Sequence, residues 1–199
     1  MSERRDELIR GGLDYLLAHG LADLSLRPLA AEIGTSARLL VYHFGSKEGL
    51  IAAIMSEVQT RLQDSFARLL TTHDRAPGQR LLPTFWDWTI RPENAGYLRL
   101  LFEVQILAIQ DPDRYGKYAE ESSSQWLDLI ERSLPASKDR RALATLCAAV
   151  VDGLLLEFLS TGDRRRTTKA LQIFDRSLVP PAKQPPGRKT TRGTKGKTR

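Results

Sequence analysis

Residues 25–44, SLRPLAAEIGTSARLLVYHF, hold the side chains whose types and spacing indicate a chemistry. Arg38 could donate two hydrogen bonds to the edge of a guanine, and Leu39 could contact the methyl group of a thymine. Tyr42 and His43 could donate to phosphate oxygens and fix the position of the segment on a duplex. This chemistry is recognition of a nucleic acid rather than the making or breaking of bonds.

Two neighbouring cations extend this set. Arg27 lies one turn into the preceding helix and is a second candidate for a base edge. Lys47 opens the following helix, where a bound phosphate would meet both its charge and the amide groups of the helix N-terminus. The full set of predicted DNA-binding residues is Arg27, Ser36, Ala37, Arg38, Leu39, Tyr42, His43 and Lys47.

The elements that must position these side chains are two short helices joined by a glycine turn. Ser25 is a typical N-cap, and Pro28 falls in the first turn, where a missing N–H costs least. Gly34 supplies the turn, and Thr35 or Ser36 caps the next helix. This layout is that of a helix-turn-helix.

The second of these helices is expected to run to about Phe44, with Leu40 and Phe44 facing the core beside Ile33. Ser46 is predicted to cap a long fourth helix. Two alternatives remain at this point. The same spacing occurs in plain helical hairpins, and a single surface arginine such as Arg38 is more often solvated than bound to a base.

The run from Leu8 to Ile54 resembles the DNA-binding head of the TetR (tetracycline-repressor-like) family. The resemblance covers about a quarter of the chain and is carried by four features in order. These are the Leu29–Ala30 pair, the glycine turn at Gly34, Leu40–Val41–Tyr42–His43–Phe44, and Ser46–Lys47–Glu48–Gly49–Leu50.

The resemblance implies a role for each matching position. Residues approaching base edges would be Arg27, Ala37, Arg38 and Leu39, and those holding the backbone would be Tyr42, His43 and Lys47. Val41 departs from the family pattern, because many members carry a tyrosine there that touches DNA. Valine cannot donate a hydrogen bond, so that contact is lost or becomes apolar.

Net charge gives no support of its own to DNA binding. The chain carries +6 overall, but the last 20 residues contain seven bases and no acid, which leaves 23 basic against 24 acidic residues elsewhere. That tail, from residue 179, has no apolar stripe and is predicted to be disordered. It is either an inert terminus or a source of nonspecific phosphate contacts.

Other function classes have little support in the sequence. The N-terminal residues are too charged for a signal peptide, and the most apolar stretch, 143–159, is interrupted by Asp152 and Glu157. The single cysteine, Cys147, suits a reducing cytoplasm. No catalytic or metal-binding pattern occurs, so we expect no enzyme, metal or cofactor and a cytoplasmic protein without membrane contact.

Helical periodicity continues beyond the loop predicted at 73–78. Helices are expected near 79–90, 93–109, 113–134, 137–160 and 163–178. We therefore predict an all-α fold in three parts: a three-helix helix-turn-helix domain at 1–46, a larger helical ligand-binding and dimerisation domain at 47–178, and a disordered basic tail at 179–199.

The last two helices are predicted to pair two copies of the chain, since the first of them is apolar on one side and has small residues on another. The alternative is that both are core helices of a monomer. The predicted dimer residues are Ala149, Asp152, Gly153, Leu156, Leu171 and Phe174.

A ligand pocket in the helical domain would be mostly apolar with a few polar groups. The predicted ligand-binding residues are Trp86, Tyr97, Phe102, Glu103 and Trp126, with Phe85, Trp88, Gln105 and Asp152 as further candidates. Aromatic residues at helical spacing are more often plain core.

These features predict a DNA-binding transcriptional regulator, a homodimeric repressor released from double-stranded operator DNA by a small apolar or aromatic effector. Two alternatives stay open: a regulator controlled by a protein partner or by its abundance, and a helical interaction protein that does not touch DNA.

Overall fold

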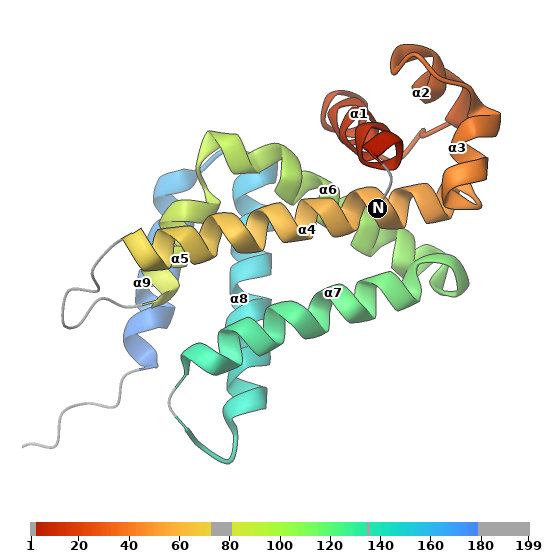
Figure 1. The fold of residues 1–199 in the computed structure, drawn as a ribbon. Helices are drawn as coiled ribbons and strands as arrows, with labels where there is room; N and C mark the ends of the chain where they lie inside the picture. Colours follow the sequence, from red (N-terminus) through yellow and green to blue (C-terminus); the bar gives the residue numbers. More distant parts are fainter. Residues whose placement is uncertain (1–2, 73–80, 135, 179–199) are drawn as a thin grey trace, which may run out of the picture.

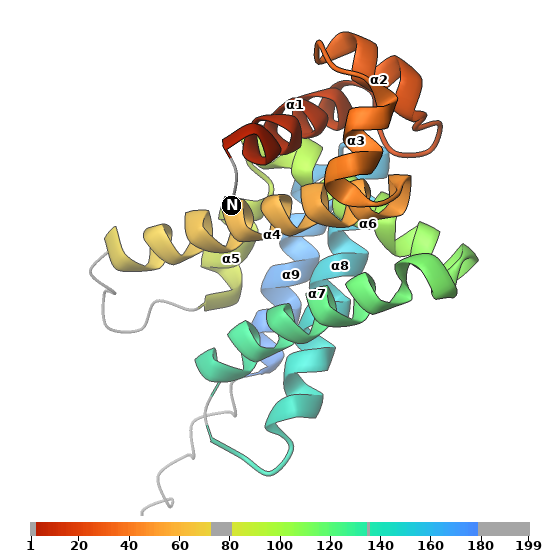
Figure 2. The same ribbon diagram turned by 45° about the vertical axis from the view of Figure 1, so that its right-hand side comes forward.

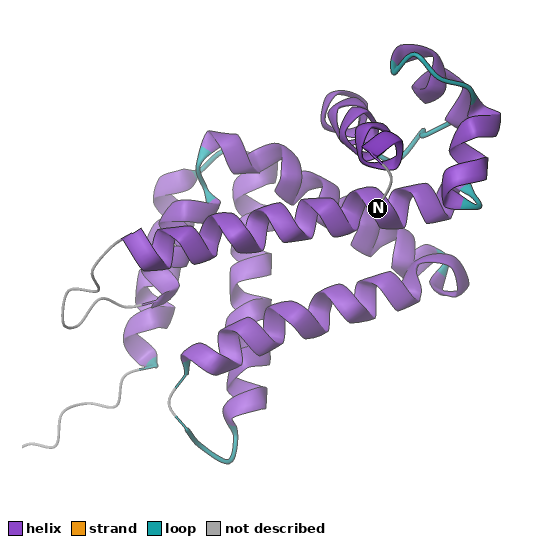
Figure 3. Cartoon of the chain, in the orientation of Figure 1, coloured by secondary structure: helices purple, strands orange, loops and turns teal. Residues whose placement is uncertain are grey.

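The computed structural model describes residues 3–72, 81–134 and 136–178, and every regular element in those ranges is an α-helix (Figure 3). The helices are α1 (Glu3–His19), α2 (Leu26–Glu32), α3 (Ala37–Phe44), α4 (Lys47–Thr72), α5 (Leu81–Thr89), α6 (Pro92–Gln110), α7 (Pro112–Ser133), α8 (Arg140–Thr161) and α9 (Arg164–Ser177). The predicted all-α class is confirmed. The predicted loop at 73–78 and the predicted disordered tail at 179–199 lie outside the described residues.

Local capping fixes where α3 and α4 begin. The Ser36 hydroxyl accepts the Leu39 N–H at 3.1 Å, and the Ser46 hydroxyl accepts the Gly49 N–H at 3.0 Å. Ser36 rather than Thr35 is therefore the cap of α3. Ser25 occupies the N-cap position of α2, but its side chain makes no capping hydrogen bond.

Two glycines inside α1 let that helix approach its neighbours closely. A Cβ atom on Gly12 would lie 2.7 Å from Cδ1 of Ile54 on α4, and one on Gly11 would lie 3.2 Å from Cβ of Ile33. Glycine weakens a helix by about 1 kcal/mol relative to alanine. Here that cost permits a contact that alanine would obstruct.

The first three helices form a head at one end of the molecule, and the long helix α4 runs from the head into the rest (Figures 1 and 2). The body consists of α5 to α9 and the C-terminal part of α4. Within it α7 packs on α6 and α8, and α8 packs on α9. The pair α8 and α9 lies side by side in both views.

The main core does not stop at the end of the head. Leu13 and Leu40 of the head, Ile54 and Phe66 of α4, and Val104 of α6 belong to one buried cluster. A second cluster joins α5, α6, α8 and α9 around Trp86. Head and body are thus connected by continuous packing along α4, and no packing break marks the predicted boundary at residue 46.

Helix α8 is unusually apolar for its exposure. Its mean hydropathy over an 18-residue window is 2.0. By length and composition alone, the helix is long and apolar enough to cross a membrane. Only 22% of that window is buried within the chain. The core helix of a soluble protein passes the same test when it is mostly buried, so the uncovered side of α8 needs an explanation.

Candidate DNA-binding head and effector cavity

Helix α3 is held on the core by one side and presents the other to solvent. Leu40 is 1% exposed, whereas Tyr42 is 81% and Val41 is 42% exposed. Arg38 is exposed, and His43 is half-buried. Large apolar and aromatic side chains left in water on so short a helix indicate a surface that is covered when the protein is bound to a partner.

The C-terminal end of α3 is fixed from three directions. Gly45 takes a left-handed conformation with φ of 78° and ends the helix. The Arg5 guanidinium of α1 lies 5.0 Å from the centre of the Phe44 ring. A Cβ atom on Gly49 would collide with the backbone carbonyl oxygen of Phe44, so α3 and α4 can meet this closely only with glycine there.

Arg27 and Arg38 face outward, and neither forms an ion pair within the described residues. Lys47 lies at the N-terminus of α4, where unpaired backbone N–H groups favour an anion. In the same turn a backbone hydrogen bond, assisted by Ser46, lowers the pKa of Glu48. All eight predicted DNA-binding residues lie on α2, on α3 with its cap, or at the start of α4, and their contacts with DNA remain predictions.

The body encloses a cavity of about 620 Å³. It lies between α4, α5, α6, α7, α8 and α9, and most of its wall is apolar. Six aromatic side chains contribute to the wall: Phe66, Phe85, Trp88, Phe102, Tyr118 and Trp126. Its polar groups are mainly serine hydroxyls, the Gln105 amide and two carboxylates. This size and lining are typical of a site for a small organic molecule.

Four of these aromatic rings form one connected cluster. The Phe66 ring centre lies 4.9 Å from that of Phe85 and 5.3 Å from that of Trp88, and Phe85 lies 5.9 Å from Trp126. The Trp88 indole N–H is bound to the Ser65 hydroxyl at 3.2 Å. The rings are therefore fixed in place and leave no indole donor from Trp88 for a ligand.

Of the five predicted ligand-binding residues, Phe102 and Trp126 line the cavity and three do not. Trp86 points into the second core, where its indole N–H donates to Thr168 at 2.8 Å. Tyr97 packs against the main core, and Glu103 turns toward the head. The structure thus corrects these three placements, because α6 and α5 each present opposite faces to different neighbours.

Helix α6 joins the cavity to the head. On one side it offers Phe102 and Gln105 to the cavity. On the other, the Glu103 carboxylate accepts the Leu21 N–H at 2.6 Å, and Arg99 donates to the carbonyl oxygens of Leu16 and Leu17 at 3.3 and 2.8 Å. Arg99 and Glu103 also form an ion pair at 3.4 Å.

This head-to-body contact acts on the end of α1, where the last carbonyl groups lack partners within the helix. A cation there is favourable because the C-terminus carries a partial negative charge. Gly96 allows the approach, since a Cβ atom at that position would lie 2.9 Å from Leu17. Helix α6 is therefore in direct contact with the C-terminal end of α1.

Comparison with known proteins identifies the head. Residues 8–54 match the family described as bacterial regulatory proteins, tetR family. The transcriptional repressor AcnR of Corynebacterium diphtheriae is 23% identical over 186 residues, which cover 89% of this chain and 93% of AcnR. The chain belongs to the TetR family. Regulators of this family are not enzymes.

Solved structures share the fold of this TetR-family protein over nearly its whole length. A TetR-family transcriptional regulator from Rhodococcus sp. superimposes with a TM-score of 0.71 at 21% identity and covers 90% of this chain and all of the other. A regulator from Saccharomonospora viridis in complex with choline gives a TM-score of 0.68 at 20% identity, covering 89% and 98%. At these identities the likeness shows the fold.

Both α8 and α9 of this TetR-family protein carry large apolar side chains that are exposed to solvent. Leu146 and Leu156 on α8 and Ile173 on α9 are 50%, 53% and 60% exposed, and Ala149 and Gly153 lie exposed between them. We call these five residues the outer face. Of the predicted dimer residues, Ala149, Gly153 and Leu156 belong to it, and Phe174 is half-buried nearby.

One of the predicted dimer residues is placed elsewhere. Leu171 is 1% exposed and packs inside the second core, so it cannot contact a partner without unfolding α9. Asp152 is exposed and also lines the cavity, and its contact with a second subunit stays a prediction. The error at Leu171 arises because α9 carries apolar residues on more than one side, and periodicity alone does not say which side faces inward.

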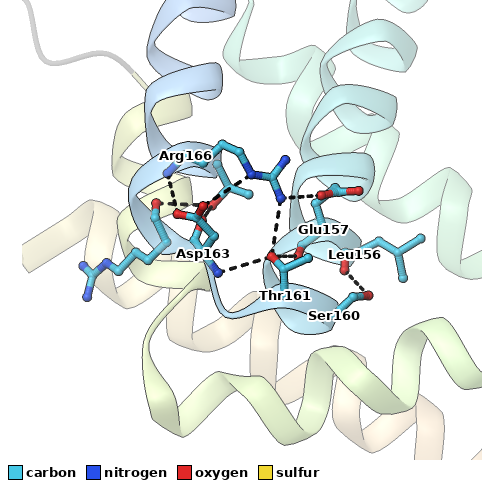
Figure 4. Close-up of polar contacts among 8 residues, drawn as sticks. Leu156, Glu157, Ser160, Thr161, Asp163 and Arg166 are labelled. Carbon is cyan, nitrogen blue, oxygen red and sulfur yellow. Dashed lines mark hydrogen bonds and ion pairs between the residues drawn. The ribbon is translucent and has the colours of Figure 1, made fainter.

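A network of polar contacts fixes α9 against α8 (Figure 4). Gly162 turns the chain with φ of 70°, and the Asp163 carboxylate caps α9 by accepting the Arg166 N–H at 2.9 Å. Arg166 reaches back to Glu157 at 2.6 Å. Helices α8 and α9 are therefore held together where the chain passes from one to the other.

Sequence reasoning missed several cavity residues that a simple spacing rule would have found. Tyr118 and Ser122 precede the predicted Trp126 at steps of four along α7 and therefore share one face of that helix with it. Phe66 of α4 belongs to the main core and is also part of the cavity wall. The missing information was which helix stood opposite each face.

Proposed function

We propose that this protein is a homodimeric transcriptional repressor that leaves its operator when a small molecule fills the cavity of the body. The observation that carries the proposal is α6, which lines the cavity with one face and holds the end of α1 with the other. In this proposal residues 1–46 bind DNA and residues 47–178 bind the effector and the second subunit, in the cytoplasm.

The physical requirement is that the ligand must bind two states of the protein with different affinity. In the DNA-bound state the two heads of the dimer would have the spacing of successive major grooves, about 34 Å. A ligand that shifts α6 would displace α1 through Arg99 and Glu103 and change that spacing. The relatives named as repressors and the choline complex support this mechanism.

The proposed function is tested by selecting duplexes from a random pool with the full-length protein. The expected product is an inverted repeat whose half-sites are centred about one helical turn apart. Binding to this duplex is then followed by fluorescence anisotropy while a library of small organic molecules is added. Release by one class of compound supports a ligand-controlled repressor, and enrichment of no sequence contradicts it.

Glu103→Ala is expected to weaken the connection between cavity and head. It leaves the Leu21 N–H without its charged acceptor, which typically costs about 1–3 kcal/mol of unfolding free energy. Glu120→Ala on α7 is the matched control, because that carboxylate is exposed and makes no ion pair within the described residues. Denaturant unfolding measures the loss of unfolding free energy. The ligand concentration needed to release the operator measures the connection between cavity and head. Identical behaviour of the two variants would contradict a role for α6 in the response.

A further inference from the structure

The charged groups in the cavity wall are all of one sign. Two carboxylates, Asp152 of α8 and Asp175 of α9, contribute to the wall, and none of its described residues is a lysine, arginine or histidine. The remaining polar groups are neutral hydroxyls, an amide and a thiol. At neutral pH the cavity therefore presents negative charge within an apolar enclosure.

Of the two carboxylates, Asp152 is the one that can still bind a ligand. No ion pair or hydrogen bond to its carboxylate is found among the described residues, whereas Asp175 is buried and already has a partner. The Asp152 side chain is exposed to solvent, but the protein around its carboxylate partly desolvates it and raises its pKa to about 6. A cation beside this unpaired carboxylate would be attracted to its negative charge and would lower its pKa again.

The aromatic rings supply a second attraction for positive charge. The face of an aromatic ring carries negative electrostatic potential, and a cation within about 6 Å of its centre is held by about 0.5–2 kcal/mol. Phe85 forms the middle of the cluster, with its ring centre 5.6 Å from that of Trp88 and 5.9 Å from that of Trp126. Flat rings and a carboxylate thus line the same enclosure.

We propose that the cavity takes an organic cation, with the carboxylate of Asp152 as its counter-ion and the Phe85–Trp88–Trp126 cluster against its apolar part. This proposal rests on the proposed function in that the cavity is the effector site. It narrows the effector from an apolar or aromatic molecule to a positively charged one. A neutral ligand would leave Asp152 charged and further desolvated, and an anion would be repelled.

The test uses two probes of the same shape, one positively charged and expected to bind tightly, the other neutral and expected to bind more weakly. Phenyltrimethylammonium and tert-butylbenzene differ only in a positively charged nitrogen in place of a carbon. Quenching of the fluorescence of Trp88 and Trp126 reports binding to the cavity without DNA. The unmodified protein is expected to bind the cation at least about tenfold more tightly than its isostere, because only the cation is attracted by the carboxylate and by the faces of the aromatic rings.

Asp152→Asn keeps the size of the side chain and removes its charge. In this variant the preference for the cation is expected to disappear, while affinity for tert-butylbenzene stays the same or increases. Ser123→Ala, another change in the cavity wall, is the matched control and should keep the preference. Sedimentation of the variant must show the same oligomeric state as the unmodified protein, because a changed state would assign Asp152 to the dimer surface instead.

The proposal also fixes the direction of the pH dependence. Cation binding needs the ionised carboxylate, so affinity for the cation should fall as the pH is lowered through about 6. Affinity for the neutral isostere should stay the same or increase over that range. The other titratable groups in the cavity wall are Asp175 on α9, Tyr118 on α7 and Cys147 on α8. Burial raises the pKa of Tyr118 to about 12 and that of Cys147 above its usual range, so neither thiol nor phenol titrates near pH 6. A fall that persists in Asp152→Asn would assign the effect to Asp175.

The outcomes separate this proposal from the proposed function. Equal binding of the two probes, binding of neither, or a preference that survives Asp152→Asn overturns the cation site. A cation that binds with the predicted preference but never releases the selected duplex leaves the cation site standing and overturns the ligand-controlled repressor.

Discussion

Arg38→Ala is expected to abolish selective binding to the operator while leaving the fold intact. Arg38 is exposed on α3 and makes no ion pair within the described residues, so its loss removes no internal contact. A bidentate contact to a guanine contributes about 1–3 kcal/mol of discrimination, and a dimer would lose it at both half-sites. Anisotropy titrations with the selected duplex and with a scrambled duplex measure the change.

The control for this prediction is Arg132→Ala on α7. Within the described residues, that guanidinium donates only to the Asp128 carbonyl oxygen of its own helix, at 3.0 Å. Arg132→Ala should therefore change neither the affinity nor the selectivity of DNA binding. Affinity for the scrambled duplex should fall much less in Arg38→Ala, because phosphate contacts supply most nonspecific binding. Full selectivity in Arg38→Ala would remove this residue from the set that contacts bases.

Leu156→Asp is expected to produce a soluble monomer. Leu156 is 53% exposed in the single chain and lies within the outer face, so its replacement disturbs no internal packing. In a two-fold interface each change occurs twice, and a carboxylate buried there without a partner costs several kcal/mol. Operator affinity should fall by at least about a hundredfold, since one head alone loses the advantage of linkage.

The matched control is Ile109→Asp on α6. Ile109 is 76% exposed and does not belong to the outer face, so the same chemical change should leave the dimer intact. Analytical ultracentrifugation across a range of concentrations distinguishes the two variants. If Leu156→Asp remains a dimer, subunits pair through another surface, and the uncovered side of α8 has a different role.

The N-terminal head could be predicted closely because its determinants are local. Ser36 and Ser46 cap the helices that follow them, and Gly34 turns the chain between α2 and α3 with φ of 67°. Each of these depends on residues within a few positions, which the sequence displays directly. The bounds of these short helices therefore followed from short-range chemistry, and the resemblance to the TetR family supplied the fold of residues 8–54.

The cavity was less predictable because its wall is assembled from distant segments. Trp86 and Trp88 are two residues apart on α5, and both are apolar enough for a pocket. Trp86 donates to Thr168 of α9 and is buried in the second core, whereas Trp88 donates to Ser65 of α4 and lines the cavity. The positions of these two side chains depend on long-range packing, which no local sequence pattern indicates.

The same limit applies to α6 and α9. Glu103 was assigned to a ligand on grounds of its polarity, but it binds the Leu21 N–H, 82 positions away in the sequence. Leu171 was assigned to the dimer from its place in an apolar stripe, but it fills the second core. The side chain type was informative in each case, and the partner was decided by the arrangement of helices.

The central claim is that two copies of this head bind successive major grooves as one dimer. Hydroxyl-radical footprinting of the full-length protein on the selected duplex tests it most directly. The expected pattern is two protected patches related by a two-fold axis, about one helical turn apart on one face of the DNA, and lost together in Leu156→Asp. A single protected patch, or uniform protection that does not depend on sequence, would contradict the account.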